Sequence, residues 1–283
     1  MSILSIQSLV AYGHAGNSAA LFPLQRLGKV VWPIMTVHFS NHTGYGDWKG
    51  PLLAPAEVAS VIDGVGDRGA FERCQAVLSG YQGAEEMGAV VLDAVAKVKA
   101  ASPDAIYCCD PVMGDVGRGM FVLPGIPEFM RDQVVPAADV ITPNHFELDF
   151  LAGVTTTTYD DLLAAVDIVR STGPDTVLVT SVIVEDTPHD ALDMVAVSGH
   201  GAWRTRFPRL ETSPPGAGDL TTAVFLANLL DSRTLDETLA RTSASVFAVV
   251  AATAEAGELE MRIVQAQDEL VAPTRTFDAI MLR

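Results

Sequence analysis

A short glycine-rich run ending in an aspartate precedes an alanine-rich stretch late in the chain. The run reads Ser213-Pro214-Pro215-Gly216-Ala217-Gly218-Asp219-Leu220. Gly216, Ala217 and Gly218 have little side-chain bulk, so their backbone can approach an anion while the following helix directs its N–H groups and positive dipole end toward it. Asp219, in the first turn, could accept a proton from an attacking hydroxyl. The pattern therefore favours phosphoryl transfer, although a bare Gly-x-Gly-Asp is more often just a turn that begins a helix.

Two more carboxylates, Asp110 and Asp115, follow an apolar segment at 105–109 that is expected to be a strand. Open α/β sheets bind ligands at the carboxyl ends of their strands, so both carboxylates can face a phosphate chain. A cation must then separate the like charges, and oxygen ligands suit Mg²⁺ together with a monovalent ion. The alternative is a strand-ending turn, which is reasonable for Asp115 taken alone.

Two polar segments end later strands. In Thr142-Pro143-Asn144-His145-Phe146-Glu147, an asparagine three residues before a glutamate is the pattern of a capping box at a helix start. Thr180 and Ser181 close an expected strand at 176–180. Their hydroxyls could bind phosphate oxygens, but without a positive charge.

A glycine-containing segment lies just beyond the aspartate pair. Gly117 and Gly119 lead to Phe121. This composition is compatible with a mobile flap that excludes water from a kinase site. It is equally compatible with a plain loop whose phenylalanine anchors it to the core.

Alternating strands and helices must position these residues. The chain opens with an apolar segment at 3–10, then Gly13-His14-Ala15-Gly16-Asn17, then a helical stretch through Leu21, Leu24 and Leu27. The alternation continues with strands at 30–36, 76–79, 105–109 and 140–142, and with helices at 57–67, 84–100 and 126–134. Such alternation predicts a mostly parallel sheet with helices on both faces.

The second half departs from strict alternation. Strands at 176–180, 194–197 and 201–208, with a polar turn at Pro188-His189-Asp190, predict an antiparallel edge. Helices are expected at 217–230, 235–256 and 261–270. Because no linker interrupts the pattern, we expect residues 1–283 to form a single domain.

Composition limits the class of protein. Hydrophobic residues make up 49% of 283, but no apolar run approaches the ~18 residues needed to cross a bilayer. The N-terminus lacks the features of a secretory signal, so a cytoplasmic location is expected. The chain has three cysteines, Cys74, Cys108 and Cys109. An odd number does not suit a disulfide framework, so we expect reduced thiols in the core.

The charge balance limits the partners. A net charge of −17 argues against nucleic acid as a partner. A phosphate ligand must then be held mainly by backbone N–H groups, a helix N-terminus and metal ions.

Several blocks resemble, in order, those of the pyridoxal kinases, a branch of the ribokinase-like superfamily. Besides the glycine run, these blocks are Ile6-Gln7-Ser8 with Tyr12-Gly13-His14-Ala15-Gly16-Asn17-Ser18-Ala19; Phe39-Ser40-Asn41-His42-Thr43-Gly44-Tyr45; Leu78-Ser79-Gly80-Tyr81; Cys109-Asp110-Pro111-Val112-Met113-Gly114-Asp115; and Thr142-Pro143-Asn144 with Glu147. The resemblance spans nearly the whole chain. It implies a three-layer α/β/α fold and ATP-dependent phosphorylation of the 5′-hydroxyl of pyridoxal, with pyridoxine and pyridoxamine as further candidate substrates.

The resemblance also implies roles on the vitamer side. Ser8 would hydrogen-bond the pyridine nitrogen, Thr43 would contact polar ring substituents, and Tyr81 would lie against the ring. Asp219 would accept the proton of the 5′-hydroxyl while the Gly216, Ala217 and Gly218 backbone steadies the transferred charge. Without the resemblance, Tyr81 is better interpreted as a core aromatic and Ser8 as a hydroxyl satisfying the end of a strand.

On the nucleotide side, the resemblance associates Asp110 and the segment starting at Thr142 with metal, alkali cation and ATP. Asn144 and Glu147 would organise water and Mg²⁺ around the phosphates. Phe121 takes the place of a tyrosine common in relatives, and Thr180-Ser181 takes the place of a lysine found in some of them. Because the positive charge of that lysine is absent, we expect Mg²⁺, with K⁺ or another monovalent cation, as the cofactor that neutralises the phosphates.

The resemblance further implies a homodimer. The adenine site stays open, because Val246, Val249 and Val250 are more typical of a helix core than of a base pocket. Two alternatives also remain: a hydroxymethylpyrimidine or sugar kinase of the same superfamily, and a non-catalytic vitamer-binding protein. An intact Asp219 argues against the second alternative.

Overall fold

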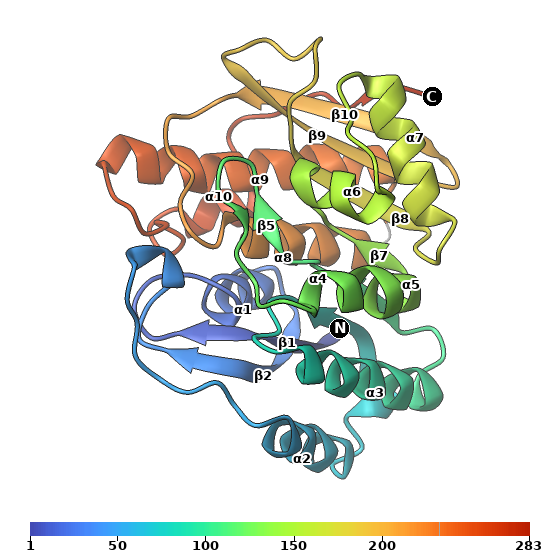
Figure 1. The fold of residues 1–283 in the computed structure, drawn as a ribbon. Helices are drawn as coiled ribbons and strands as arrows, with labels where there is room; N and C mark the ends of the chain where they lie inside the picture. Colours follow the sequence, from blue (N-terminus) through green and yellow to red (C-terminus); the bar gives the residue numbers. More distant parts are fainter. Residues whose placement is uncertain (232) are drawn as a thin grey trace.

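The computed structural model describes residues 1–231 and 233–283, and its centre is one mixed sheet (Figure 1). Within these residues nine strands pair in the order β11-β10-β9-β8-β7-β4-β3-β1-β2. They are β1 (Ser2–Val10), β2 (Val30–Phe39), β3 (Cys74–Ser79), β4 (Ile106–Cys109), β7 (Val140–Ile141), β8 (Thr176–Val182), β9 (Ala191–Ser198), β10 (Gly201–Pro208) and β11 (Ile280–Met281). From β2 to β8 along this order, neighbouring strands pair in parallel. The pairs β8–β9, β9–β10 and β10–β11 are antiparallel. The predicted antiparallel edge is confirmed.

Helices cover both faces of the sheet, which gives the predicted three layers (Figure 1). One layer contains α1 (Asn17–Arg26), α8 (Ala217–Leu230), α9 (Leu235–Ala256) and α10 (Gln267–Val271). The other contains α2 (Pro55–Gly66), α3 (Glu85–Ala101), α4 (Ile126–Phe129), α5 (Val135–Ala137), α6 (His145–Ala152) and α7 (Tyr159–Arg170). Helix α8 contacts α1 and α9 and is buried from Leu220 to Asn228, which explains why its sequence is apolar on nearly all sides.

Two predicted helices were wrong in part. The segment expected to be helical at 261–270 is helical only in α10, since residues 263–266 form a turn and the buried Met261 precedes that turn outside any helix. The helix expected at 126–134 is split into α4, a π-helical turn over Met130–Val134, and α5. Pro136 follows the π turn, where a proline cannot donate a regular helical hydrogen bond.

The parallel strands bring the predicted site residues to one edge of the sheet. In a parallel sheet the segments that follow each strand converge at its carboxyl edge. Those segments contain Thr43 after β2, Tyr81 after β3, Asp110 after β4 and Thr142 after β7, while Thr180 lies near the end of β8. Ser8 lies at a register irregularity in the β1–β2 pairing, two residues before β1 ends.

Two expectations from the composition can be compared with the structure. Cys74, Cys108 and Cys109 are free and buried, as predicted. Within residues 1–231 and 233–283, no helix combines the length and the apolar character that spanning a bilayer requires.

Candidate active site

A cavity of about 650 Å³ opens at the carboxyl edge of the sheet. Every site residue predicted from the sequence lines it: Ser8, Thr43, Tyr81, Asp110, Asp115, Phe121, Thr142, Asn144, Glu147, Thr180, Ser181, Gly216, Ala217, Gly218 and Asp219. The fold thus gathers residues that are up to 211 positions apart, from Ser8 to Asp219, around one space.

Gly216 forms the mouth of helix α8. It is the N-cap residue and has a left-handed backbone, φ 81° and ψ 2°. A Cβ at this position would lie 1.9 Å from the carbonyl oxygen of His14, so no side chain can be accommodated. The first N–H groups of α8 can therefore face an anion in the cavity.

Asp219 lies in the first turn of α8, half-buried at the cavity wall. Burial raises the pKa of its carboxyl to about 6, and hydrogen bonding from the backbone of Gly16 and of Asp219 itself opposes that rise. At neutral pH most of the carboxylate is ionised and can accept a proton.

Asp110 is buried in the wall of the site, with 5% of its surface exposed. Burial raises its pKa well above the usual range, and the nearby charges of Asp219 and Glu147 add to the effect. Its Oδ2 accepts a hydrogen bond from Thr222 Oγ1 at 3.2 Å. The like charges of these carboxylates therefore act on Asp110 and disfavour its ionised form.

Thr222 is a site residue that sequence reasoning missed. Its Oγ1 lies 2.7 Å from Thr142 Oγ1, so it joins α8 to the ends of β4 and β7. Its position three residues after Asp219, on the same face of a helix, was the available signal.

Asn144 and Glu147 form the predicted capping box of α6. Each side chain accepts the other's backbone N–H at 2.9 Å. Glu147 Oε1 also accepts the Met113 N–H at 2.8 Å, and Asn144 Nδ2 donates to the Gly114 carbonyl at 2.8 Å. Burial raises the pKa of Glu147 to about 7 although these backbone hydrogen bonds oppose the rise. The pair therefore fixes the segment that leads into the flap.

The segment that was compatible with a flap or a plain loop contains a short hairpin, β5 (Gly114–Asp115) and β6 (Gly119–Met120). Phe121 follows it, donates its N–H to the Met113 carbonyl at 3.0 Å and keeps 42% of its surface exposed. The Arg118 guanidinium lies 5.1 Å from the centre of the Phe121 ring. Arg118 also lines the cavity and was not predicted.

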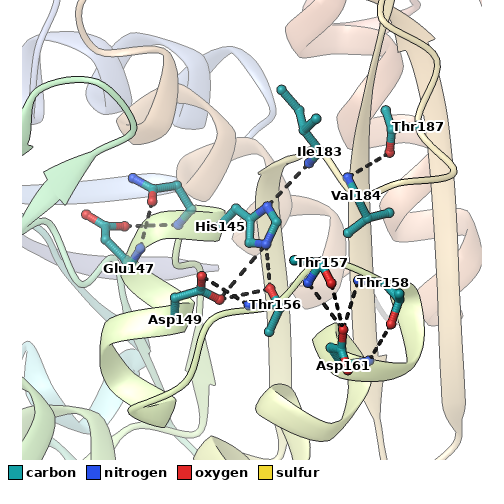
Figure 2. A network of polar contacts seen from close by, with 11 residues as sticks. His145, Glu147, Asp149, Thr156, Thr157, Thr158, Asp161, Ile183, Val184 and Thr187 are labelled. Carbon is teal, nitrogen blue, oxygen red and sulfur yellow. Dashed lines mark hydrogen bonds and ion pairs between the residues drawn. The ribbon is translucent and has the colours of Figure 1, made fainter.

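Thr180 and Ser181 are held beside the capping box. Thr180 donates its N–H to the Pro143 carbonyl at 2.9 Å, and Ser181 adopts a left-handed backbone at φ 54°. His145 supports this bend: its Nδ1 accepts the Ile183 N–H at 3.3 Å, and its Nε2 lies 2.6 Å from Thr156 Oγ1 (Figure 2). An Nε2–H tautomer satisfies both contacts, and burial lowers the pKa of His145. The imidazole ring is therefore uncharged at neutral pH and stabilises this bend through its two hydrogen bonds.

At the other end of the cavity lies a pocket suited to a flat ring. Tyr81 packs against a small cluster formed by Val10, Ala15, Val37 and Phe39. Ser8 and Thr43 line the same cavity and carry hydroxyl groups. An aromatic face with a few fixed polar partners is a usual design for binding a heteroaromatic ligand.

The site suits a divalent cation that is shared with a phosphate ligand. Among residues 1–231 and 233–283, no three His, Cys, Asp or Glu side chains are grouped closely enough to hold a metal ion. Mg²⁺ is commonly bound by only one or two carboxylates together with substrate phosphates. The buried Asp110, whose pKa is raised by neighbouring acids, is the carboxylate that such a cation would best compensate.

A second cavity of about 640 Å³ adjoins the first. The two share wall residues that include Asp115, Thr180, Ser181 and Gly218. Val246 and Val250 line this second cavity, whereas Val249 is fully buried in the core. Of these three valines, only Val249 has the purely core position that the sequence predicted for all of them.

Comparison with known proteins agrees with this geometry. The model of the phosphomethylpyrimidine kinase family matches residues 72–263. The chain is 54% identical to pyridoxal kinase PdxY of Rubrobacter xylanophilus over 98% of this chain and 96% of that protein, and 52% identical to pyridoxal kinase PdxY of Leifsonia xyli subsp. xyli over 98% of each. It superimposes on pyridoxal kinase from Leishmania donovani in complex with ADP and pyridoxine with a TM-score of 0.92 and 30% identity, over 100% of this chain and 99% of that one.

The layered fold, with Gly216 and Asp219 at the start of α8 lining the cavity, defines a kinase of the ribokinase-like class. Within that class, the chain belongs to the pyridoxal kinase family.

The acidic cluster predicts a stability that depends on pH. A carboxyl whose pKa is raised in the folded state stabilises the fold at low pH, and this contribution is lost as pH rises toward the folded pKa. In metal-free protein with EDTA, Asp110→Asn should therefore raise the melting temperature at pH 8 and raise it less at pH 5. Each kcal/mol gained in the free energy of unfolding corresponds to about 2–4 °C. Thermal denaturation at several pH values measures this. A constant difference between variant and wild type across this range would contradict the assignment.

Proposed function

We propose that this protein transfers the γ-phosphoryl group of ATP to the 5′-hydroxyl of pyridoxal, with pyridoxine and pyridoxamine as further substrates, in the salvage of vitamin B6. One observation carries the proposal: Asp219, at the mouth of α8, lines the same cavity as Ser8, Thr43 and Tyr81. A proton acceptor and the partners for an aromatic alcohol thus share one space. The relatives named pyridoxal kinase and the structure with ADP and pyridoxine support the same reaction.

In this proposal Ser8 binds the pyridine nitrogen, Thr43 binds a ring substituent and Tyr81 packs against the ring. The hydroxymethyl group then points toward α8. Asp219 accepts its proton as the oxygen attacks the γ-phosphorus, while the backbone N–H groups at Gly216, Ala217 and Gly218 stabilise the transferred charge.

The nucleotide enters from the second cavity. Its base lies beside Val246 and Val250, and its phosphates cross the shared wall at Thr180 and Ser181 toward Gly218. Both hydroxyls are available as donors there. Phe121 and the hairpin cover the vitamer side and limit access of water.

Mg²⁺, with K⁺ or another monovalent cation, is the proposed cofactor set. Bound Mg²⁺ neutralises charge on the phosphates. Asp110 would hold it directly. Both carboxylate oxygens of Glu147 already accept backbone N–H groups, so Glu147 would act through water, together with Asn144.

The decisive measurement is a panel of pyridoxal, pyridoxine, pyridoxamine and hydroxymethylpyrimidine with ATP, run with and without Mg²⁺ and K⁺. We expect the highest kcat/KM for pyridoxal, loss of turnover in EDTA and a lower rate without K⁺. Preference for hydroxymethylpyrimidine, which the name of the matching family model makes the second candidate, would overturn the substrate assignment. Tight pyridoxal binding without an ATP-dependent product would indicate a binding protein.

Two further expectations belong to this proposal. The single continuous sheet with a core on each face supports one domain over residues 1–283. A homodimer is proposed from the family relationship alone, and sedimentation velocity would test it.

A further inference from the structure

In the part of the chain that the structure describes, the segment that contains Thr43 makes one hydrogen bond to a distant residue. We call residues 41–48 the vitamer loop. The loop is held internally, since Asn41 Nδ2 donates to the Asp47 carbonyl at 2.9 Å and His42 Nδ1 accepts the Gly44 N–H at 3.0 Å. Among the residues that the structure describes, the loop's single hydrogen bond to another segment is donated by Tyr45 Oη to Glu260 Oε1 at 2.7 Å.

Glu260 has a second partner in the turn between β1 and α1. Its Oε2 accepts the His14 N–H at 2.9 Å. Gly13 in the same turn has φ 86°, and a Cβ there would lie 2.0 Å from Glu260 Oε2. The carboxylate is therefore packed directly against this turn while its other oxygen holds the vitamer loop.

The same turn supports the anion hole. The His14 carbonyl oxygen occupies the space next to Gly216, 1.9 Å from where a Cβ would stand, and Met261 Cε is 3.0 Å from that point. Met261 is buried, and Arg262 donates its N–H to Thr253 Oγ1 at 3.0 Å, which fixes the backbone that follows this methionine to α9. Glu260 thus lies where the vitamer loop, the β1–α1 turn and the anion hole meet.

We propose that Glu260 is a positioning residue that locks the vitamer loop onto the turn supporting the anion hole. By doing so it sets the distance between the alcohol of the bound vitamer and the transferred phosphoryl group. The choice of substrate in this inference rests on the proposed function, whereas the link itself rests on the Tyr45 and His14 contacts.

The chemistry of Glu260 suits a two-sided link. A carboxylate has two acceptor oxygens and makes stronger hydrogen bonds than a neutral group does. Its two donors come from positions 215 and 246 residues away in the chain. An alanine would leave both donors without this acceptor, whereas Tyr45→Phe would release only the vitamer loop.

Steady-state kinetics of Tyr45→Phe, Glu260→Ala and the double variant test the inference. Tyr45→Phe should raise KM for pyridoxal roughly tenfold, because one hydrogen bond to a charged group is lost. KM for ATP should stay within about twofold, since the loop faces the vitamer. Glu260→Ala should raise KM for pyridoxal at least as much and also lower kcat, because the His14 turn is released. The double variant should match Glu260→Ala, since Tyr45 has lost its partner there.

Glu258→Ala is the matched control, because Glu258 is paired with Arg262 on the surface and does not line the cavity. It should leave both KM values and kcat unchanged. Hydrogen exchange of residues 41–48 in the absence of substrate should be faster in Tyr45→Phe and Glu260→Ala than in wild type or the control.

Additive effects of the two substitutions on KM, or unchanged exchange in the vitamer loop, would overturn the inference. If Glu260→Ala does not fold, Tyr45→Phe still decides it, because Tyr45 is exposed and the substitution removes only a hydroxyl. If wild-type protein phosphorylates no B6 vitamer, the proposed function is wrong, and the exchange data still report on the link itself.

Discussion

Asp219→Asn is expected to lower kcat for pyridoxal phosphorylation by a factor of about 10²–10⁴, the usual contribution of a general base. An asparagine has nearly the same shape but cannot accept the proton of the attacking hydroxyl. The neighbouring backbone N–H groups at the mouth of α8 remain in place, so Kd values for pyridoxal and ADP should change little. Steady-state kinetics and titration calorimetry measure the two effects separately.

Loss of activity through unfolding can be distinguished from this result. Burial raises the pKa of Asp219 to about 6, so the ionised side chain costs stability at neutral pH, and Asp219→Asn should be at least as stable as wild type. Asp236→Asn is a matched control, because Asp236 lies in the first turn of α9 and does not line either cavity. Near-normal turnover of Asp219→Asn would show that another group accepts the proton.

Gly216→Ala is expected to abolish ATP-dependent turnover and to destabilise the fold. The residue has φ 81°, where a side chain costs about 1–2 kcal/mol, and its Cβ would lie 1.9 Å from the His14 carbonyl oxygen. Relief of that contact must move either the β1–α1 turn or the start of α8, and a displacement of about 1 Å can cost about 10²-fold in rate. Kinetics and chemical denaturation together measure both losses.

Gly28→Ala separates backbone strain from the contact. Gly28 also has a left-handed backbone, φ 78°, but no atom lies within 4 Å of its Cβ position. This control should lose about 1–2 kcal/mol of stability and keep normal turnover. Equal activity of the two variants would mean that Gly216 does not shape the anion hole.

Local sequence patterns determined much of the architecture. Strands and helices alternate with different hydrophobic periods, so the mixed sheet and the antiparallel edge were predictable from the chain alone. The long alanine-rich helices were placed well, and α8 and α9 have the predicted bounds. The capping box of Asn144 and Glu147 was also predictable, because it depends on residues three positions apart.

Elements whose form depends on distant contacts were not predictable. The helix expected at 261–270 is mostly absent because Met261 and Ile263 are drawn into the core beneath α8 and α9. The hairpin of β5 and β6 is too short to show a hydrophobic period. Thr222 had only its helical spacing from Asp219 as a signal, and Arg118 has no local signature that separates it from an ordinary loop residue.

The sequence by itself determined which residues could bind a phosphate and accept a proton, because glycine freedom, helix polarity and carboxylate basicity are properties of a few adjacent residues. Only the tertiary structure decided that Glu260 joins Tyr45 to His14. It also raised the pKa of Asp219 and Asp110, since burial and charge proximity arise only when distant strands and helices meet. A hydrogen bond spanning 215 residues has no local pattern, and its energy exists only once the chain has folded.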